Sequence, residues 1–484
     1  MKWRTILSSL RSADMRKRLL IVLGMIVAYR FLAHVPVPLA QPTALKEVVN
    51  NVLNSSDFGG FLNLLSGGAL ASFSIVLVGL SPYITASVIT QLLTKVIPKL
   101  EELHKDGESG RRKINQWTRM VALPLAIVQS IAFIFILRQT VLAGNSASLA
   151  GTTTFDIVIA VIAMAAGAML LMWLGELITE QGVGNGISLL IFSGIISQLP
   201  SNLGTIGQSL FQPASQAARL HVFGLVLPID SRSFYVSFGI IAISLIVLYL
   251  LVKINEAQRV IHINYAKRVQ GNSAYGGITS ILPVKLITAG VIPVIFAVAF
   301  LALPAFIGQV LKAGKDPHVA TFAQNLINAF QAPNATTLAT SNVISLLHVG
   351  AINLMIDERF IYPIVYFFLV VAFTYFYTSI VFNADEIAEN LQKQGGFISH
   401  VRPGASTARY LKKIVNRLTL FGSVTLGIIA VLPFVGEYVF AELGINVANL
   451  AIGGTGLLIV VSVALESLRQ INSRALMVTY DEYK

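Results

Sequence analysis

The sequence contains no cysteine and few charged residues. The absence of cysteine excludes disulfide bonds, thiolate metal sites and cysteine catalysis. Charged residues make up only 12% of the 484 residues, whereas 55% are hydrophobic, and the mean hydropathy is +0.73. Such a chain cannot cover a soluble globule with polar side chains. The composition therefore predicts an integral membrane protein.

The chain also lacks the short motifs of the common enzyme classes. It has no H-E-x-x-H sequence, no Walker loop and no G-x-S-x-G turn. Its histidines and carboxylates do not cluster at the spacing that metal ligands need. We therefore expect no enzymatic activity, no metal and no cofactor.

Ten segments of the chain are apolar enough to cross a bilayer. A crossing needs about 20 mostly apolar residues, and of single segments only a helix satisfies its own backbone in lipid. The sequence therefore predicts an all-α membrane protein with ten transmembrane helices, at about 19–35, 72–98, 119–141, 155–177, 184–199, 234–252, 286–308, 360–382, 418–440 and 448–470.

Lysine and arginine are distributed unevenly among the connecting segments. If the N-terminus is cytoplasmic, 27 of the 35 basic residues fall on the inner side and 7 on the outer side, with Arg30 inside the first span. This agrees with the positive-inside rule and predicts that both termini are cytoplasmic. The basic inner face reflects either topology alone or a docking surface for anionic partners.

The ten predicted spans divide into two sets of five. An N-terminal half, residues 1–233, and a C-terminal half, residues 234–484, would have opposite orientations and form an inverted repeat. This arrangement places a pathway between the halves. The inner loops 253–285 and 383–417 combine basic residues with Gly and Pro and are expected to protrude. The outer loop 309–359 contains no motif that predicts a function.

A short apolar motif precedes the second span. Phe61, Leu62, Leu64 and Leu65 are bracketed by glycine pairs, the second being Gly67 and Gly68. So short a motif cannot cross a bilayer, and irregular backbone at membrane depth is tolerated only inside protein or beside water. The segment 57–72 is either a re-entrant element that plugs a cavity or an outer-surface helix.

Ionisable residues are scarce inside the predicted spans. Arg30, His34, Glu176 and Glu437 all lie close to a membrane interface, where they can reach water or cap a helix. A proton-coupled carrier is expected to keep a charge near mid-membrane. The sequence therefore disfavours a secondary transporter for a small solute, which remains the alternative function. A membrane-embedded hydrolase lacks any candidate nucleophile.

Aliphatic residues stand beside the helix-breaking or small-residue motifs of the spans. In a membrane helix such residues ordinarily pack or face lipid, but together they would also suit a deformable constriction that excludes water and ions. They are Leu80, Ile84, Ile187, Ile191, Ile295 and Ile459.

Uncharged polar residues occur in the second and third spans. Thr90, Gln91, Gln129 and Ser130 are candidates for interhelical hydrogen bonds of about 0.6 kcal/mol each. They are either ordinary contacts between helices or a seam weak enough to open.

Several ordered motifs resemble the SecY family, the channel subunits of bacterial protein translocases. The resemblance runs almost end to end and rests on LSGGALA (65–71), SPYITASVITQLL (81–93), DGESGRRKINQWTR (106–119), MWLGELITEQGVGNGIS (172–188), INYAKR (263–268), AGVIPVIF (289–296), VFNADEIAENLQKQGGF (381–397), RPG (402–404) and GGTGLLIVV (453–461).

The resemblance implies a fold and a role for each candidate site. The fold would be two five-helix halves around an hourglass pore, with the six aliphatic residues as its ring and 57–72 as its plug. Thr288 would join the four polar residues at a lateral gate between spans two and three and spans seven and eight. Loops 253–285 and 383–417 would receive the ribosome or the SecA motor through Arg259, Lys267, Arg268 and Arg402.

The implied function is a protein-conducting channel of the bacterial plasma membrane. It would translocate unfolded secretory polypeptides and release signal sequences and membrane helices sideways into lipid. SecE, SecG and SecA would be its partners, together with the ribosome. This chain departs from the family pattern at His262, Ile287 and the pair Ser399–His400.

Overall fold

A computed structural model describes most of the chain. The described residues are 13–38, 73–143, 153–211, 219–222, 225–265, 268–270, 273–275, 279–288, 290, 292–312, 317–330, 343–349, 352–442 and 454–482. The predicted plug, 57–72, and Lys267 lie outside them.

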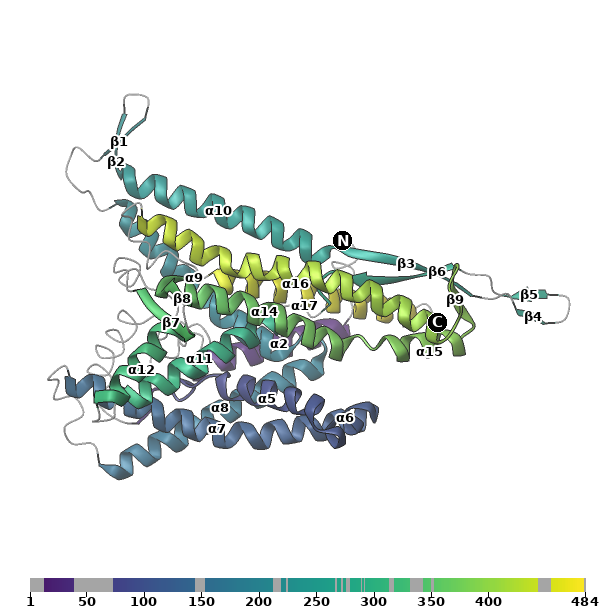
Figure 1. Ribbon diagram of the computed structural model, residues 1–484, viewed down its shortest axis with the longest axis horizontal. Helices are drawn as coiled ribbons and strands as arrows, with labels where there is room; N and C mark the ends of the chain where they lie inside the picture. The colour runs from purple at the N-terminus through teal and green to yellow at the C-terminus, as the bar shows by residue number, and fades with distance from the viewer. Residues whose placement is uncertain are drawn as a thin grey trace.

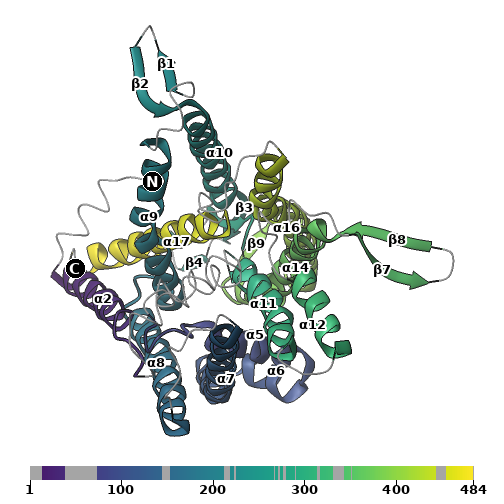
Figure 2. The same cartoon turned by 90° about the vertical axis from the view of Figure 1, so that its left-hand side faces the viewer.

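Each of the ten predicted spans overlaps a helix. The helices are α2 (Ala13–Leu32), α5 (Ser81–Val96), α6 (Pro98–Lys105), α7 (Gly107–Ala143), α8 (Thr154–Gln181), α9 (Gly186–Phe211), α10 (Ser231–Glu256), α11 (Ile292–Lys312), α12 (Pro317–Phe330), α14 (Glu358–Val381), α15 (Ala384–Lys393), α16 (Ala405–Glu442) and α17 (Gly454–Glu482). Figure 2 shows them end-on, with α2 and α8 on one side and α11, α12, α14 and α16 on the other.

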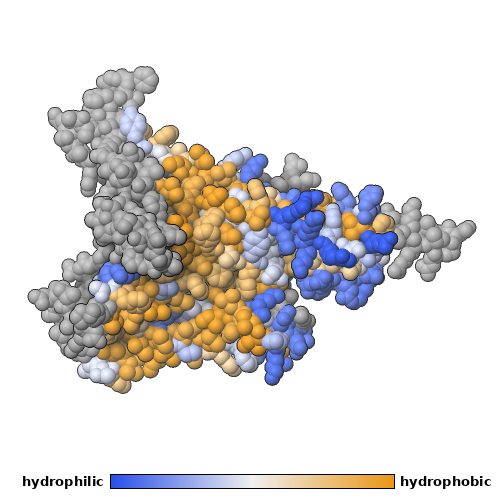
Figure 3. Space-filling model, viewed as in Figure 1, coloured by the Kyte–Doolittle hydropathy of each residue, from blue (hydrophilic) through white to orange (hydrophobic). Residues whose placement is uncertain are grey.

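Five helices within the described residues are long and apolar enough to cross a membrane by themselves. These stretches are Arg112–Phe135, Thr154–Gln181, Ser237–Glu256, Ile361–Lys393 and Ala405–Gly436. Two shorter apolar helices, Gly186–Pro200 and Ile292–Ala305, lie among them. Apolar residues cover the middle of the molecule in Figure 3, as expected of a surface that faces lipid.

Two predicted boundaries are wrong. The charged segment Lys105–Arg119, expected as a loop, belongs mostly to α7, because a helix that leaves the membrane can continue in water with solvated side chains. The second span begins later than expected: residues 73–80 form turns, and α5 starts at Ser81 with Pro82 in its first turn. Proline suits that position because its missing N–H has no helical partner there.

The connecting segments contain strands that the all-α prediction omitted. The strands are β1 (Arg219–Val222), β2 (Leu225–Asp230), β3 (Gln258–Tyr265), β4 (Arg268–Gln270), β5 (Ser273–Tyr275), β6 (Thr279–Lys285), β7 (Val343–Val349), β8 (Ile352–Asp357) and β9 (Gly396–Ile398). They form antiparallel hairpins, except that β9 adds to β3 to make a three-stranded sheet in the order β6-β3-β9.

The hairpins lie at opposite ends of the molecule. The sheet β6-β3-β9, helix α15 and helix α6 extend at one end in Figure 1, and hairpins β1–β2 and β7–β8 lie at the other. The first group belongs to segments predicted as cytoplasmic and the second to segments predicted as external. The arrangement thus agrees with the topology that the basic residues predict.

One large hydrophobic cluster joins both predicted halves. It includes Val76 and Leu171 from the first half and Val294, Tyr366 and Leu458 from the second. Within it, the Tyr366 hydroxyl is fully buried and makes no hydrogen bond to any residue that the structure describes. A buried polar group without a partner lowers stability by about 1–3 kcal/mol.

Replacing Tyr366 with Phe is therefore expected to raise the free energy of unfolding by about 1 kcal/mol, since the ring stays and the unpaired hydroxyl is removed. Thermal unfolding of purified protein would measure the change. Thr374→Val is the matched control, because the buried Thr374 hydroxyl does donate to the Val370 carbonyl at 2.6 Å. That variant should be less stable than the parent, and a stability loss in Tyr366→Phe would contradict the prediction.

Candidate functional site

The six aliphatic residues of the predicted ring meet in the large hydrophobic cluster. Five of them are less than 10% exposed and belong to its core: Leu80, Ile84, Ile191, Ile295 and Ile459. Ile187 is partly buried and packs against the same cluster. The cluster also contains side chains of α8, α14 and α16, so the six are part of one continuous apolar core between the halves.

The ring residues come from four separate elements. Leu80 is the N-cap of α5 and accepts the backbone N–H of Ile84 at 3.0 Å, so this pair is fixed by the first turn of the helix. Ile187 and Ile191 lie at the start of α9, one turn apart. Ile295 and Ile459 lie near the starts of α11 and α17. Helix α5 packs on α11, and α9 packs on α17.

The helices of the predicted lateral gate contact one another along a seam between the two predicted halves. Helix α11 contacts α5 and α7 from the first half as well as α14 from the second. Thr90 and Ser130 are buried on α5 and α7, while Gln91 and Gln129 are half-buried. Thr288 lies in the turn that leads from β6 into α11.

The prediction that these polar residues bond between helices is wrong for the hydroxyls. Thr90 donates to the Ala86 carbonyl at 2.8 Å, and Ser130 donates to the Ala126 carbonyl at 2.7 Å, each within its own helix. Thr288 donates to the Lys285 carbonyl at 3.2 Å. A hydroxyl already bonded to its own helix adds little across the seam. The described contacts therefore make the seam mainly apolar.

One amide oxygen at the seam lacks a hydrogen-bond partner among the described residues. Gln91 donates from Nε2 to Ser87 Oγ at 3.0 Å, while its Oε1 is buried without a hydrogen bond to any described residue. Such an acceptor remains available to a water molecule.

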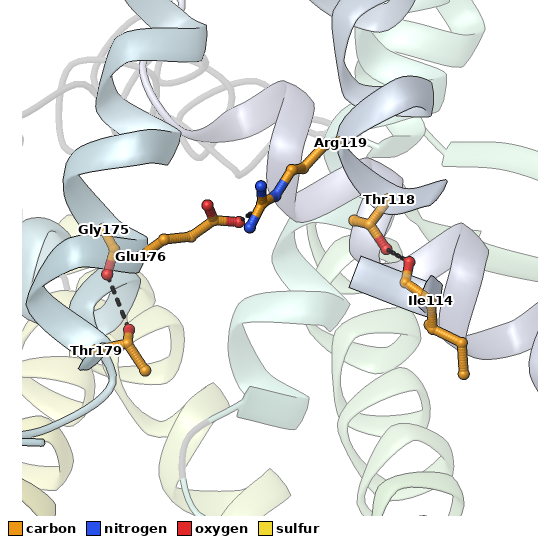
Figure 4. A network of polar contacts seen from close by, with 6 residues as sticks. All are labelled: Ile114, Thr118, Arg119, Gly175, Glu176 and Thr179. Atoms are coloured by element: carbon orange, nitrogen blue, oxygen red, sulfur yellow. Dashed lines mark hydrogen bonds and ion pairs between the residues drawn. The ribbon is translucent and has the colours of Figure 1, made fainter. Parts of the chain in front are cut away.

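An ion pair joins the helices behind the seam. Arg119 on α7 and Glu176 on α8 approach to 2.7 Å between Nε and Oε1, as Figure 4 shows. The sequence placed Glu176 at the inner end of a span without naming its partner. Its side chain is 19% exposed and that of Arg119 is 47% exposed. The pair holds α7 against α8.

The predicted docking loops fold into one module with its own core. Strands β3, β6 and β9, helix α15 and the start of α16 bury Ile261, Ile398 and Leu411 together in this core. Arg259 lies on β3, and Arg402 follows the turn after β9, the strand that pairs with β3 through residues 263–265; both arginine side chains are exposed. Arg268 lies on β4. In Figure 3 this end of the molecule is hydrophilic.

The residues that depart from the family pattern lie at defined positions in the structure. Ser399 and His400 form the turn after β9, where His400 has a φ of +64°. Asn264 of β3 donates to Ser399 Oγ at 3.0 Å, and Thr407 donates to the Arg402 carbonyl at 2.9 Å. His262 is exposed on β3, whereas Ile287 is 5% exposed in the large cluster. The turn before Arg402 is thus held from both sides.

A model of the SecY family matches residues 74–468. The protein translocase subunit SecY of Mycobacterium tuberculosis is 37% identical over 483 residues, which cover 99% of this chain and 98% of that protein. This chain belongs to the SecY family.

The SecY-family fold is also visible in solved structures. A SecY channel studied for its plug domain is 17% identical and aligns with a TM-score of 0.59, over 94% of this chain and 90% of that one. Sec61 in the canine ribosome-channel complex is 17% identical, with a TM-score of 0.52 over 93% and 90% of the two chains. At such identities the likeness concerns the fold alone. The predicted helical membrane architecture of the family is confirmed.

Two charged residues inside the last predicted span, Glu466 and Arg469, were not singled out from the sequence. Glu466 falls within 448–470 and is half-buried on α17. Its carboxylate interacts electrostatically with Lys285 and Arg469. A scan of the last span for acidic residues would have found it, but only the fold shows that Lys285 lies nearby.

Proposed function

We propose that this chain is the protein-conducting channel of a bacterial translocase. Unfolded polypeptides pass between its two halves, residues 1–233 and 234–484, and apolar segments leave sideways through the seam between α5 and α7 on one side and α11 and α14 on the other. The six aliphatic residues form the ring through which the translocated polypeptide must pass.

The observation that carries the proposal is the meeting of the six residues in one buried cluster. They come from four elements and from both predicted halves, yet five of them are buried and Ile187 is half-buried. Aliphatic side chains make no strong hydrogen bonds with water, so such a ring stays dry at rest and deforms around an extended polypeptide. The related M. tuberculosis protein is a protein translocase subunit, which supports the same activity here.

Signal helices open the channel by differential binding. A ligand shifts a conformational equilibrium only by binding one state better than the other. An apolar helix gains about 25 cal/mol for each Å² that it buries, and the apolar seam offers that surface in its open state. Because the hydroxyls at the seam bond within their own helices, opening breaks few hydrogen bonds.

Directional movement comes from partners. The sequence has no phosphate-binding loop, so nucleotide hydrolysis by a SecA-type motor or elongation by a ribosome supplies the work. Sec61 and Ssh1 have been seen bound to ribosomes. The module of β3, β6, β9 and α15 presents exposed Arg259 and Arg402 to such partners. SecE and SecG complete the channel, and both termini of this chain face the cytoplasm.

Reconstituted vesicles test the proposal. Passage of a secretory precursor when the motor and companion subunits are supplied supports the channel. Uptake of a small solute by this chain alone, without precursor passage, would instead support the secondary transporter. An arrested precursor should also crosslink to a cysteine placed at Ile191, since the chain has no other cysteine.

A further inference from the structure

The second half of α17 contacts connections from both predicted halves. Figure 2 shows α17 between α9 and α16, and the helix also packs on α10. Along one stretch, residues 466–474, its polar side chains reach the turn between α8 and α9 on one side and the link between β6 and α11 on the other.

On the side of the first half, the contact is made at glycines. Gly182 ends α8 with a φ of +68°, and a β-carbon there would overlap the Arg474 guanidinium. A β-carbon on Gly184 would lie 2.8 Å from Ser467 Oγ. The turn itself is well held, because Thr179 Oγ1 accepts the N–H of Gly186 at 2.8 Å. Side chains of α17 therefore pack directly on this backbone.

On the side of the second half, the contacts are charged. Arg469 donates to the Asn255 carbonyl at the end of α10, with an N–O distance of 2.8 Å. Burial and repulsion by Arg469 hold the pKa of Lys285 below its ordinary value, while attraction by Glu466 opposes that shift. The N–H of Leu286 donates to the Ala257 carbonyl at 2.9 Å, so the end of β6 is tied to the end of α10.

The Glu466 carboxylate also lies against the link that leads into α11. Gly290 has a φ of +63°, and a β-carbon there would come within 3.9 Å of Glu466 Oε2. The positive φ marks Gly290 as the place where the chain turns before the helix begins at Ile292. Helix α11 is the element that contacts α5 and α7 across the seam. Any group that fixes its start also fixes the seam.

We propose that residues 466–474 of α17 form a clasp between the two halves, and that Glu466 positions the start of α11 and thereby sets how readily the seam opens. This proposal rests on the channel function. Ser467 and Arg474 pack on the α8–α9 turn, Arg469 bonds the end of α10, and Glu466 lies beside the Gly290 link and attracts Lys285. Glu466 acts through α11 and is a positioning residue.

The test begins with Glu466→Gln in reconstituted vesicles. Loss of the negative charge frees the Gly290 link, so a precursor with an inactivated signal sequence should pass about tenfold more readily. Passage of the intact precursor should stay close to that of the parent. A purely structural role would instead lower passage of both precursors together. Unchanged discrimination between the two precursors would overturn the proposal.

Further variants separate charge from packing. Glu466→Asp keeps the charge and should largely restore discrimination. Lys285→Gln should relax it in the same direction, and the double variant should show less than the sum of the two effects, as expected for groups in contact. Asp14→Asn is the matched control, since it removes the carboxylate of an exposed pair with Arg18 at 2.8 Å on α2. It should leave discrimination unchanged.

A measurement without transport distinguishes failure of the clasp from failure of the channel function. Spin labels on cysteines at Ile307 of α11 and Ser473 of α17, both exposed, report the distance between the two helices. Glu466→Gln should broaden or shift this distance, and Asp14→Asn should not. If no precursor passes in any variant but the distance responds, the clasp stands and the channel function fails. An unchanged distance would overturn the clasp by itself.

Discussion

Replacing Ile84 and Ile191 together with Ser is expected to raise ion leakage through the protein at least tenfold. Both side chains are buried in the cluster that joins the halves, at 3% and 1% exposure. Hydroxyls at these positions bind water, and the larger space admits it, so a constriction that is dry at rest becomes wet. Conductance of single channels in planar bilayers would measure the leak.

The control for this variant separates wetting from general loss of stability. Ile178→Ser introduces the same hydroxyl at a site that is equally buried in the same cluster, but on α8 and outside the ring. Removing most of a buried isoleucine costs about 2–5 kcal/mol at either site. Ile178→Ser should therefore lower stability without leakage, and Ile191→Leu should keep the seal. Unchanged conductance in the double variant would remove the ring assignment.

Reversing Arg402 to Glu should lower motor-driven transport about tenfold while the fold remains intact. Arg402 is exposed at the turn beside β9, and its backbone carbonyl is held by Thr407, so the charge reversal changes the surface rather than the turn. A reversed charge at the edge of an interface weakens association and makes it more sensitive to salt. Transport of a precursor at several motor and salt concentrations would measure this.

The comparison variant is Arg16→Glu, which makes the same charge change on an exposed residue of α2, away from the docking module. Both variants should unfold within about 0.5 kcal/mol of the parent, as surface substitutions do. If extra motor restores transport in Arg402→Glu, the defect lies in binding. Normal transport at every motor concentration would show that Arg402 does not dock a partner.

Much of the fold was predictable because membrane insertion is decided locally. Each apolar window loses or gains transfer free energy by its own composition, so spans could be predicted one at a time, and each predicted span overlaps a helix. The errors fell where water meets the helix ends. The charged start of α7 continues the helix beyond the predicted span, and the segment 253–285 forms strands that pair with one another, to which β9 adds.

The candidate site was only partly predictable. Ile191 and Ile459 could be singled out because small residues stand beside them, but their meeting in one cluster depends on how α9 packs on α17. Thr90 and Ser130 illustrate the opposite case. As uncharged polar residues in apolar spans they suggested bonds between helices, yet each hydroxyl donates to the carbonyl four residues earlier. Backbone geometry makes that bond available to every Ser or Thr in a helix.

The sequence by itself determined that this chain lies in a membrane, where its apolar segments run and to which family it belongs. Those properties depend on the composition of neighbouring residues or on the order of motifs along the chain. The tertiary structure alone decided that Leu80 and Ile459 share a core, that β9 pairs with β3, and that Glu466 lies beside the link before α11. Such contacts join residues far apart in the chain, so they depend on the packing of all the helices at once.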